Sequence, residues 1–144
     1  MNILAKLLPK RRTSTNLDPE HALRAAAEWL ARAQDATGSG GVSAHYDAAK
    51  RKWVGAYPET TGYIIPTLFR YAEFCGDTVW RERAIRMAAW ESDIQLPDGG
   101  VRAGTMDAVQ VEPTIFNTGQ VLFGWLAAWQ QTQDARFRDS LVRA

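Results

Sequence analysis

Two parts of this chain repeat each other at a spacing of about 58 residues, and this internal repeat limits the fold more than any other feature. The segment "FCGDTVWRERA" aligns with "QTQDARFRDSL", which pairs Asp77 with Asp134. Thr61-Gly62 and Thr118-Gly119 have the same separation, and the turn "GSGGV" matches "PDGGV" further upstream. Matching turn residues at such a period predict a repeat architecture rather than one irregular domain.

Each repeat contains two helical patterns of different character. Residues 19–35 and 78–95 are amphipathic, with charged residues opposite an apolar stripe, so each is expected to show one face to water. The stripes are Ala22, Ala26, Trp29, Leu30 and Ala33 in the first helix and Trp80, Ala84, Met87, Ala88 and Ile94 in the second. The segments "GYIIPTLFRYAEFC" and "TGQVLFGWLAAWQQTQ" carry two charges and none, so they are expected to be covered on most sides. The tryptophans at helical positions are expected in the core: Trp29, Trp80, Trp90, Trp125 and Trp129.

An amphipathic helix followed by a buried one, repeated, predicts an all-α fold of helical hairpins in two layers, forming part of an (α/α) toroid. The predicted repeats are residues 19–76 and 77–133, with a third beginning at 134–144, after a flexible basic arm of residues 1–18. The long connections 37–60 and 96–117 are expected at one end, where binding and catalytic residues usually lie. Pro66 predicts either a kink in its helix or a regular helix that begins only near Tyr63.

The two long connections and the helix starts after them carry carboxylates, aromatic rings and amides, a mixture that suits a sugar. For glycoside chemistry two carboxyl groups should lie about 5 to 9 Å apart, and Glu59 with Glu112 or Asp107 is the predicted catalytic pair. An epimerase or lyase would need an acid and a base, for which Glu59, Tyr57 and His45 are available. The predicted substrate-binding residues are His45, Tyr46, Trp53, Tyr57, Tyr63 and Asn117. The structural alternatives are that Glu59 only complements the helix dipole and that His45 only bonds to backbone.

Composition excludes several other classes of protein. The net charge of +1 provides no field that would attract nucleic acid or anionic lipid. One cysteine and two histidines, far apart in sequence, do not form a zinc motif, and we expect neither a metal nor another cofactor. No stretch approaches the roughly 20 apolar residues that cross a bilayer, and the N-terminal apolar run is too short for a signal peptide. We therefore expect a cytoplasmic protein.

The segments "AAEWLARAQDATGSGGV" and "MAAWESDIQLPDGGV" resemble the helix and Gly-Gly turn of the prenyltransferase and squalene cyclase repeats. "YPETTGYIIPTL" is more similar to the helical toroids of carbohydrate-active proteins, including the uronate epimerases and six-hairpin glycosidases of bacterial polysaccharide metabolism. The resemblance covers about residues 22–144 and implies the toroid fold and a sugar substrate. An Asp-x-Asp-Asp acid motif is absent from the sequence, which makes a terpenoid cyclase or prenyltransferase the weaker alternative.

A closed ring of about six hairpins at this period would need about 350 residues. We therefore expect a fragment, in preference to a domain that completes a ring with other copies or a small two-hairpin protein. The functional hypothesis is a partial toroid that processes carbohydrate as an epimerase, lyase or hydrolase, and that is inactive if the missing hairpins are needed. The alternative is a noncatalytic helical module that binds a protein or associates with itself, for which exposed apolar surface is expected within residues 121–129.

Overall fold

The computed structural model describes residues 18–144, and these residues form five helices and one short β-hairpin. The helices are α1 (Pro19–Asp35), α2 (Pro58–Cys75), α3 (Thr78–Ile94), α4 (Ile115–Thr132) and α5 (Ala135–Arg143). The strands β1 (Tyr46–Asp47) and β2 (Lys52–Trp53) pair antiparallel within the first long connection. The prediction of an all-α fold is confirmed. The predicted arm lies outside the described residues except for Asp18, whose carboxylate accepts a hydrogen bond from the Glu20 amide and caps α1.

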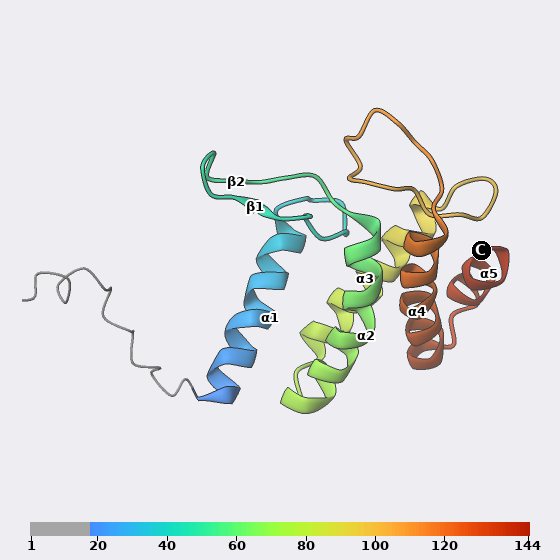
Figure 1. The fold of residues 1–144 in the computed structure, drawn as a ribbon. Helices are drawn as coiled ribbons and strands as arrows, with labels where there is room; N and C mark the ends of the chain where they lie inside the picture. Colours follow the sequence, from blue (N-terminus) through green and yellow to red (C-terminus); the bar gives the residue numbers. More distant parts are fainter. Residues whose placement is uncertain (1–17) are drawn as a thin grey trace, which may run out of the picture.

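Helices α2 and α4, which are the two apolar helices and are called the inner helices below, pack along each other, with α3 behind them and α5 beside α4 (Figure 1). Short turns join α2 to α3 and α4 to α5, and Asp77 and Asp134 cap the helices that follow, as their pairing in the sequence predicts. Both long connections lie at the opposite end, where the Met106 amide donates to the Ala56 carbonyl at 2.9 Å and joins the second connection to the first. The prediction that these connections share one end is therefore confirmed.

The core is centred on the contact between α2 and α4 and on the face of α3 that covers it. Ile65 and Leu68 from α2, Met87 from α3, and Val121 and Trp125 from α4 are almost completely buried. Phe137 from α5 extends the same cluster past α4. This core fixes the starts of α2 and α4 side by side beneath the long connections.

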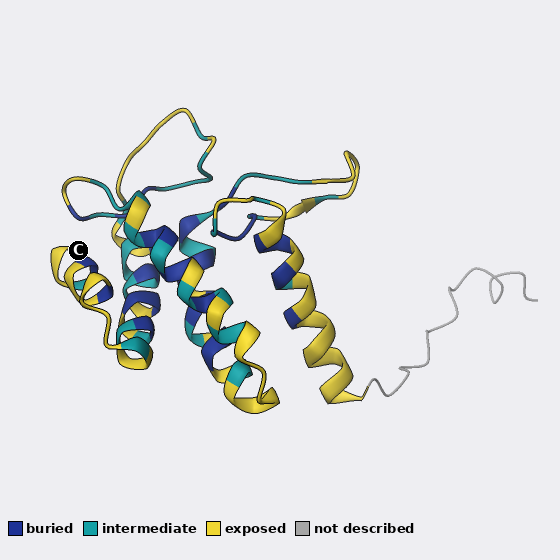
Figure 2. Ribbon diagram, turned by 180° about the vertical axis from the view of Figure 1, so that it is seen from behind, coloured by how far each residue is buried: buried dark blue, intermediate teal, exposed yellow. Residues whose placement is uncertain are grey.

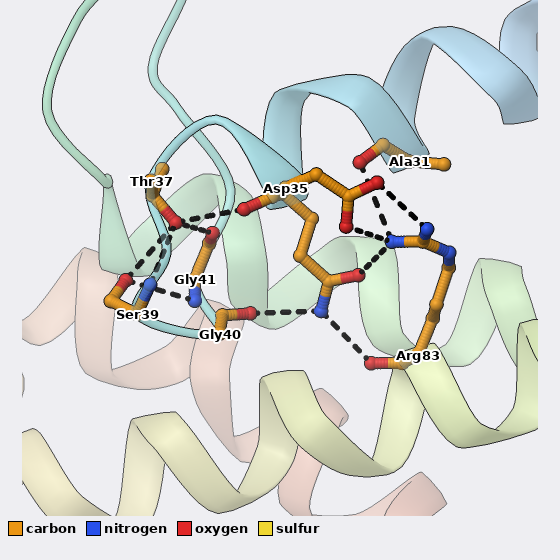
Figure 3. A network of polar contacts seen from close by, with 8 residues as sticks. Ala31, Asp35, Thr37, Ser39, Gly40, Gly41 and Arg83 are labelled. Carbon is orange, nitrogen blue, oxygen red and sulfur yellow. Dashed lines mark hydrogen bonds and ion pairs between the residues drawn. The ribbon is translucent and has the colours of Figure 1, made fainter.

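A hydrogen-bond network at the end of α1 has a counterpart at the end of α3. The Gln34 side-chain amide donates to the Gly40 and Arg83 carbonyls (Figure 3), and Gln95 donates in the same way to the Gly99 and Ser140 carbonyls. Each glutamine therefore joins its own Gly-Gly turn to the next amphipathic helix. The acceptors Arg83 and Ser140 are separated by 57 residues, the spacing found in the sequence.

The starts of the two inner helices are also held by matching bonds. The Thr61 hydroxyl accepts from the Val42 amide at 2.8 Å, and the Thr118 hydroxyl accepts from the Val101 amide at 2.9 Å. Both hydroxyls donate to a carbonyl four residues earlier in the chain. The residues that repeat in the sequence thus make the same contacts twice.

The predicted apolar stripe of α1 is wrong in its N-terminal part. Ala22, Ala26 and Trp29 are exposed, and the buried residues are instead Ala27, Ala31, Ala33 and Gln34 (Figure 2). The physical reason is that only the C-terminal half of α1 packs on the domain, while its N-terminal half is separated from Phe74 and Trp80 by an open cleft. Trp29, expected in the core, is 46% exposed.

Helix α2 starts at Pro58, so the alternative in which Pro66 delays the regular helix to Tyr63 is wrong. Pro66 has no amide hydrogen for the Gly62 carbonyl four residues earlier. That carbonyl faces α4 at Gly124, where an added Cβ atom would lie only 2.7 Å from it. The carbonyl that Pro66 leaves free therefore lies at a close approach of the two inner helices.

Candidate functional site

Four of the predicted site residues meet where α2 and α4 begin. Tyr57 immediately precedes α2, and its amide donates to the Val42 carbonyl, which fixes the entry of the chain into the helix. Glu59 occupies the first turn of α2 and Asn117 the first turn of α4, and both lie near enough to the Tyr57 hydroxyl to affect its pKa. Tyr63 follows one turn after Glu59 and exposes 43% of its surface. We call Tyr57, Glu59, Tyr63 and Asn117 the helix-start cluster.

The electrostatics of the helix-start cluster are set by Glu59. Hydrogen bonding to the Glu59 carboxylate raises the pKa of Tyr57, and partial burial and the negative charge of Glu59 act in the same direction. Hydrogen bonding to Asn117 opposes this rise. Asn117 is held in place because its side-chain amide donates to the Arg102 carbonyl at 3.0 Å. The cluster thus combines a proton donor, a carboxylate and a fixed amide.

Glu59 also lies where it can complement the dipole of α2, the structural alternative given by the sequence. Helix α2 has no side chain that caps its first amides, and Glu59 is the acidic residue of its first turn. A carboxylate there is stabilised by the helix dipole, typically by about 0.3 to 1 kcal/mol. This role is compatible with the position of Glu59 beside Tyr57.

A groove of about 460 Å³ runs between α2 and α4 from Tyr63 toward their C-terminal ends. On the α2 side it is lined by Tyr63, Arg70 and Glu73, and on the α4 side by Phe123 and Gln130 among others. The Gln131 side chain donates to the Glu73 carboxylate across the groove at 3.0 Å. Tyr63 belongs both to the helix-start cluster and to this groove, so it connects the two.

A separate aromatic cluster forms where the β-hairpin meets α1. Tyr46 and Trp53 are opposite each other in the antiparallel pair, with ring centroids 5.2 Å apart. Trp29 completes the cluster at 4.8 Å from Trp53 and 6.1 Å from Tyr46, and the Arg32 guanidinium lies over the Trp29 ring. The predicted substrate-binding residues Tyr46 and Trp53 are therefore together, but they form a different group from the helix-start cluster. We call Trp29, Tyr46 and Trp53 the aromatic cluster.

The remaining predicted residues lie elsewhere in the two long connections. Asp107 is exposed and lies against Gly55; a hydrogen bond from Thr105 lowers its pKa, helped by its own amide and by the charges of Arg102 and Lys52. Glu112 is exposed and accepts a hydrogen bond from Gln110. His45 is exposed, and its carbonyl accepts from the Val54 amide and the Ser43 hydroxyl. The three predicted catalytic carboxylates thus each have a different set of neighbours.

Two notable residues are not among those predicted from the sequence. The sequence places Trp29 in the core. The one hint of the aromatic cluster is that the helix containing Trp29 precedes the long connection containing Trp53. Glu91 is fully buried in α3, neither carboxylate oxygen has a hydrogen-bond partner, and burial raises its pKa well above the usual range. Glu91 follows Met87 by four residues, which places it on the buried stripe of the helix, so its burial could have been predicted from the sequence.

Within residues 18–144, no helix is both long and apolar enough to cross a membrane, and no three His, Cys, Asp or Glu side chains are grouped as metal ligands. No protein-family model matches this sequence, and no curated protein or solved structure is significantly similar to it.

Proposed function

We propose that this chain is part of an (α/α)-toroid protein that binds carbohydrate at the end bearing its long connections. The observation that carries the proposal is the helix-start cluster, in which the exposed Tyr63 ring adjoins Tyr57, Glu59 and Asn117 at the mouth of the groove between α2 and α4. An exposed ring can stack on the apolar face of a sugar, while a carboxylate and an amide can bond to its hydroxyls.

The lining of the groove favours a hydroxyl-rich ligand over a terpenoid. Arg70, Glu73, Gln130 and Gln131 supply charged and amide groups along its length. A hydrocarbon would cover Arg70 and Gln130 without offering them hydrogen-bond partners, which costs binding free energy. A sugar chain would provide partners for them, and Arg70 would suit one that carries carboxylates.

The toroid part of the proposal is supported by the contacts that occur twice. Gln34 and Gln95 each bond forward to the next amphipathic helix, and Thr61 and Thr118 each hold the start of an inner helix. Repeat proteins are characterised by contacts that recur in the same way between each hairpin and the next.

If the site also carries out a reaction, Glu59 and Tyr57 are its proposed acid–base pair. An epimerase or lyase needs one group that removes the proton from a carbon and another that delivers a proton to the substrate. The Glu59 carboxylate would be the base and the Tyr57 hydroxyl the acid. A hydrolase would instead need a second carboxylate, for which Asp107 and Glu112 stay the predicted candidates.

Titration of the purified chain with short oligosaccharides, neutral and uronate-containing, tests the binding proposal by NMR shifts of the backbone amides. We expect shifts at residues 57–63 and 117, and about a tenfold loss of affinity or more in Tyr63→Ala. Phe74→Ala is the matched control, because Phe74 is also an exposed aromatic residue of α2 but lies at its far end. Absence of binding to every oligosaccharide, or an equal loss in Phe74→Ala, would refute the proposal.

The reaction is tested separately on any oligosaccharide that binds. New reducing ends, a new carbon–carbon double bond or an inverted sugar centre would identify a hydrolase, lyase or epimerase. Glu59→Gln should abolish the product while retaining most of the binding. Unchanged turnover in Glu59→Gln would exclude Glu59 as the acid–base residue.

A further inference from the structure

The side of α4 that faces away from the domain is apolar and open. Ile115 is 95% exposed, Phe116 64% and Phe123 58%, and Leu126 is also exposed. Together with Gly119 and Leu122 these residues border a shallow depression that continues to Leu141 of α5. We call Ile115, Phe116, Gly119, Leu122, Phe123 and Leu126 the α4 face. Phe123 and Leu126 also line the groove between α2 and α4, so contact through this face would cover that part of the groove. Helix α4 contains no charged residue, so nothing on this helix favours a charged partner.

The α4 face has the features of a surface made for close helix packing. On α2, Gly62 lies at the contact with α4, and a Cβ atom on it would be 2.7 Å from the Val121 Cα atom. Gly119 has the equivalent place on α4, one residue after the threonine that holds the helix start, but no atom lies within 4 Å of a Cβ atom built there. The α4 face therefore keeps a glycine gap with nothing against it.

The size of the α4 face fits a weak but specific dimer. Four large apolar side chains exposed to this extent present about 500 Å² of apolar surface. This area is near the upper end of the range for the largest apolar patch on a monomeric protein. Two such faces in contact would bury about 1,000 Å², the lower limit for a specific interface. A second copy supplies an uncharged apolar helix for this face, in the place that the next inner helix would take in the proposed toroid.

The α4 face is also complementary to itself. Gly119 is a gap and Phe123, one turn later, is a projecting ring on the same side of the helix. In an antiparallel two-fold pair of α4 helices, Phe123 of each copy would enter the gap at Gly119 of the other. The same axis places Phe116 opposite Leu126, so each exposed ring meets an apolar partner.

We propose that the chain forms a two-fold dimer through antiparallel contact of the α4 faces. The test is the mass of the full chain by sedimentation equilibrium from about 1 to 300 µM, since an interface of this size typically dissociates in the micromolar range. The mass should rise with concentration from 16.1 kDa toward twice that value. Gly119→Lys, whose Cβ atom would have no other atom within 4 Å in the monomer, should weaken association about tenfold or more.

Phe74→Lys is the matched control, because it places the same charge on an exposed aromatic position at the far end of α2. It should associate like the unmodified chain. A mass that stays at 16.1 kDa throughout would overturn the proposal, as would growth beyond two copies or unchanged association of Gly119→Lys. Circular dichroism of Gly119→Lys at the lowest concentration should show unchanged helicity, so loss of association cannot be attributed to unfolding.

Discussion

Gly62 in α2 and Val121 in α4 are so close that a single added methyl group cannot fit between them. A Cβ atom on Gly62 would lie 2.7 Å from both the Cα and a methyl carbon of Val121, and the backbone of α4 leaves no flexible atom to move aside. This contact sets the spacing of the two inner helices, and with it the distance between Glu59 and Asn117 at their starts.

Gly62→Ala should therefore lower the free energy of unfolding by about 1 to 3 kcal/mol, the usual cost of overpacking. Gly119→Ala is the matched control, because it has open space and should gain about 0.5 to 1 kcal/mol from better helix propensity. Urea unfolding at low micromolar concentration, where the proposed dimer is dissociated, measures both. If the two substitutions changed the free energy of unfolding equally, the close contact of Gly62 with α4 would be contradicted.

Burial of Glu91 makes stability depend on pH. Its native pKa is raised well above 4.5, so the folded protein holds this proton at pH values where the unfolded chain has released it. Stability from this group is present in full below the unfolded pKa and is lost as pH rises toward the native pKa, by about 1.4 kcal/mol per pH unit.

Glu91→Gln should remove this part of the pH dependence, so the variant should gain stability relative to the unmodified protein as pH rises above the unfolded pKa of Glu91. Subtracting the two unfolding curves cancels the opposite contributions of Asp35 and Asp107, whose pKa values are lowered. Glu82→Gln, an exposed position on the same helix, is the control and should leave the pH profile unchanged. A stability difference independent of pH would show that Glu91 is ionised in the folded protein.

The two glutamine networks should contribute similarly to stability. Gln34→Ala leaves the Gly40 and Arg83 carbonyls without their donor, and Gln95→Ala does the same to Gly99 and Ser140. Each substitution should cost about 1 to 3 kcal/mol in chemical unfolding. Gln131→Ala, which removes one exposed hydrogen bond, should cost less than about 0.5 kcal/mol. A large effect at only one of Gln34 and Gln95 would contradict equivalent roles.

The repeat period and the alternation of amphipathic and apolar segments are sufficient to predict the helices and the shared end of the long connections. These features are local or periodic, so a sequence displays them directly. The exposed half of α1 is not predictable in this way, because the stripe through Ala22, Ala26 and Trp29 has helical spacing whether or not a neighbour covers it. The neighbour is what the sequence pattern does not specify.

The candidate site is predictable only in part for the same reason. Tyr57, Glu59 and Tyr63 share the start of one helix, and Asn117 lies at the start of the other, α4. Trp29 joins Tyr46 and Trp53 only because a β-hairpin, too short to leave a periodic signal, folds back over α1. Glu112 and Asp107 lie on irregular backbone, whose direction depends on contacts such as Met106 with Ala56.

The hydrogen bonding of Tyr57 provides a test of the helix-start cluster that needs no ligand. Since Glu59 is the main cause of the raised pKa of Tyr57, Glu59→Gln should lower that pKa toward 10.0. The measurement is the titration of the tyrosine absorbance at alkaline pH, compared between the two proteins and assigned with Tyr57→Phe. Glu73→Gln is the control, because Glu73 is another carboxylate of α2 but bonds to Gln131 and should leave Tyr57 unaffected. If the Tyr57 titration is identical in Glu59→Gln and the unmodified protein, the two side chains do not interact, and the description of the helix-start cluster is wrong.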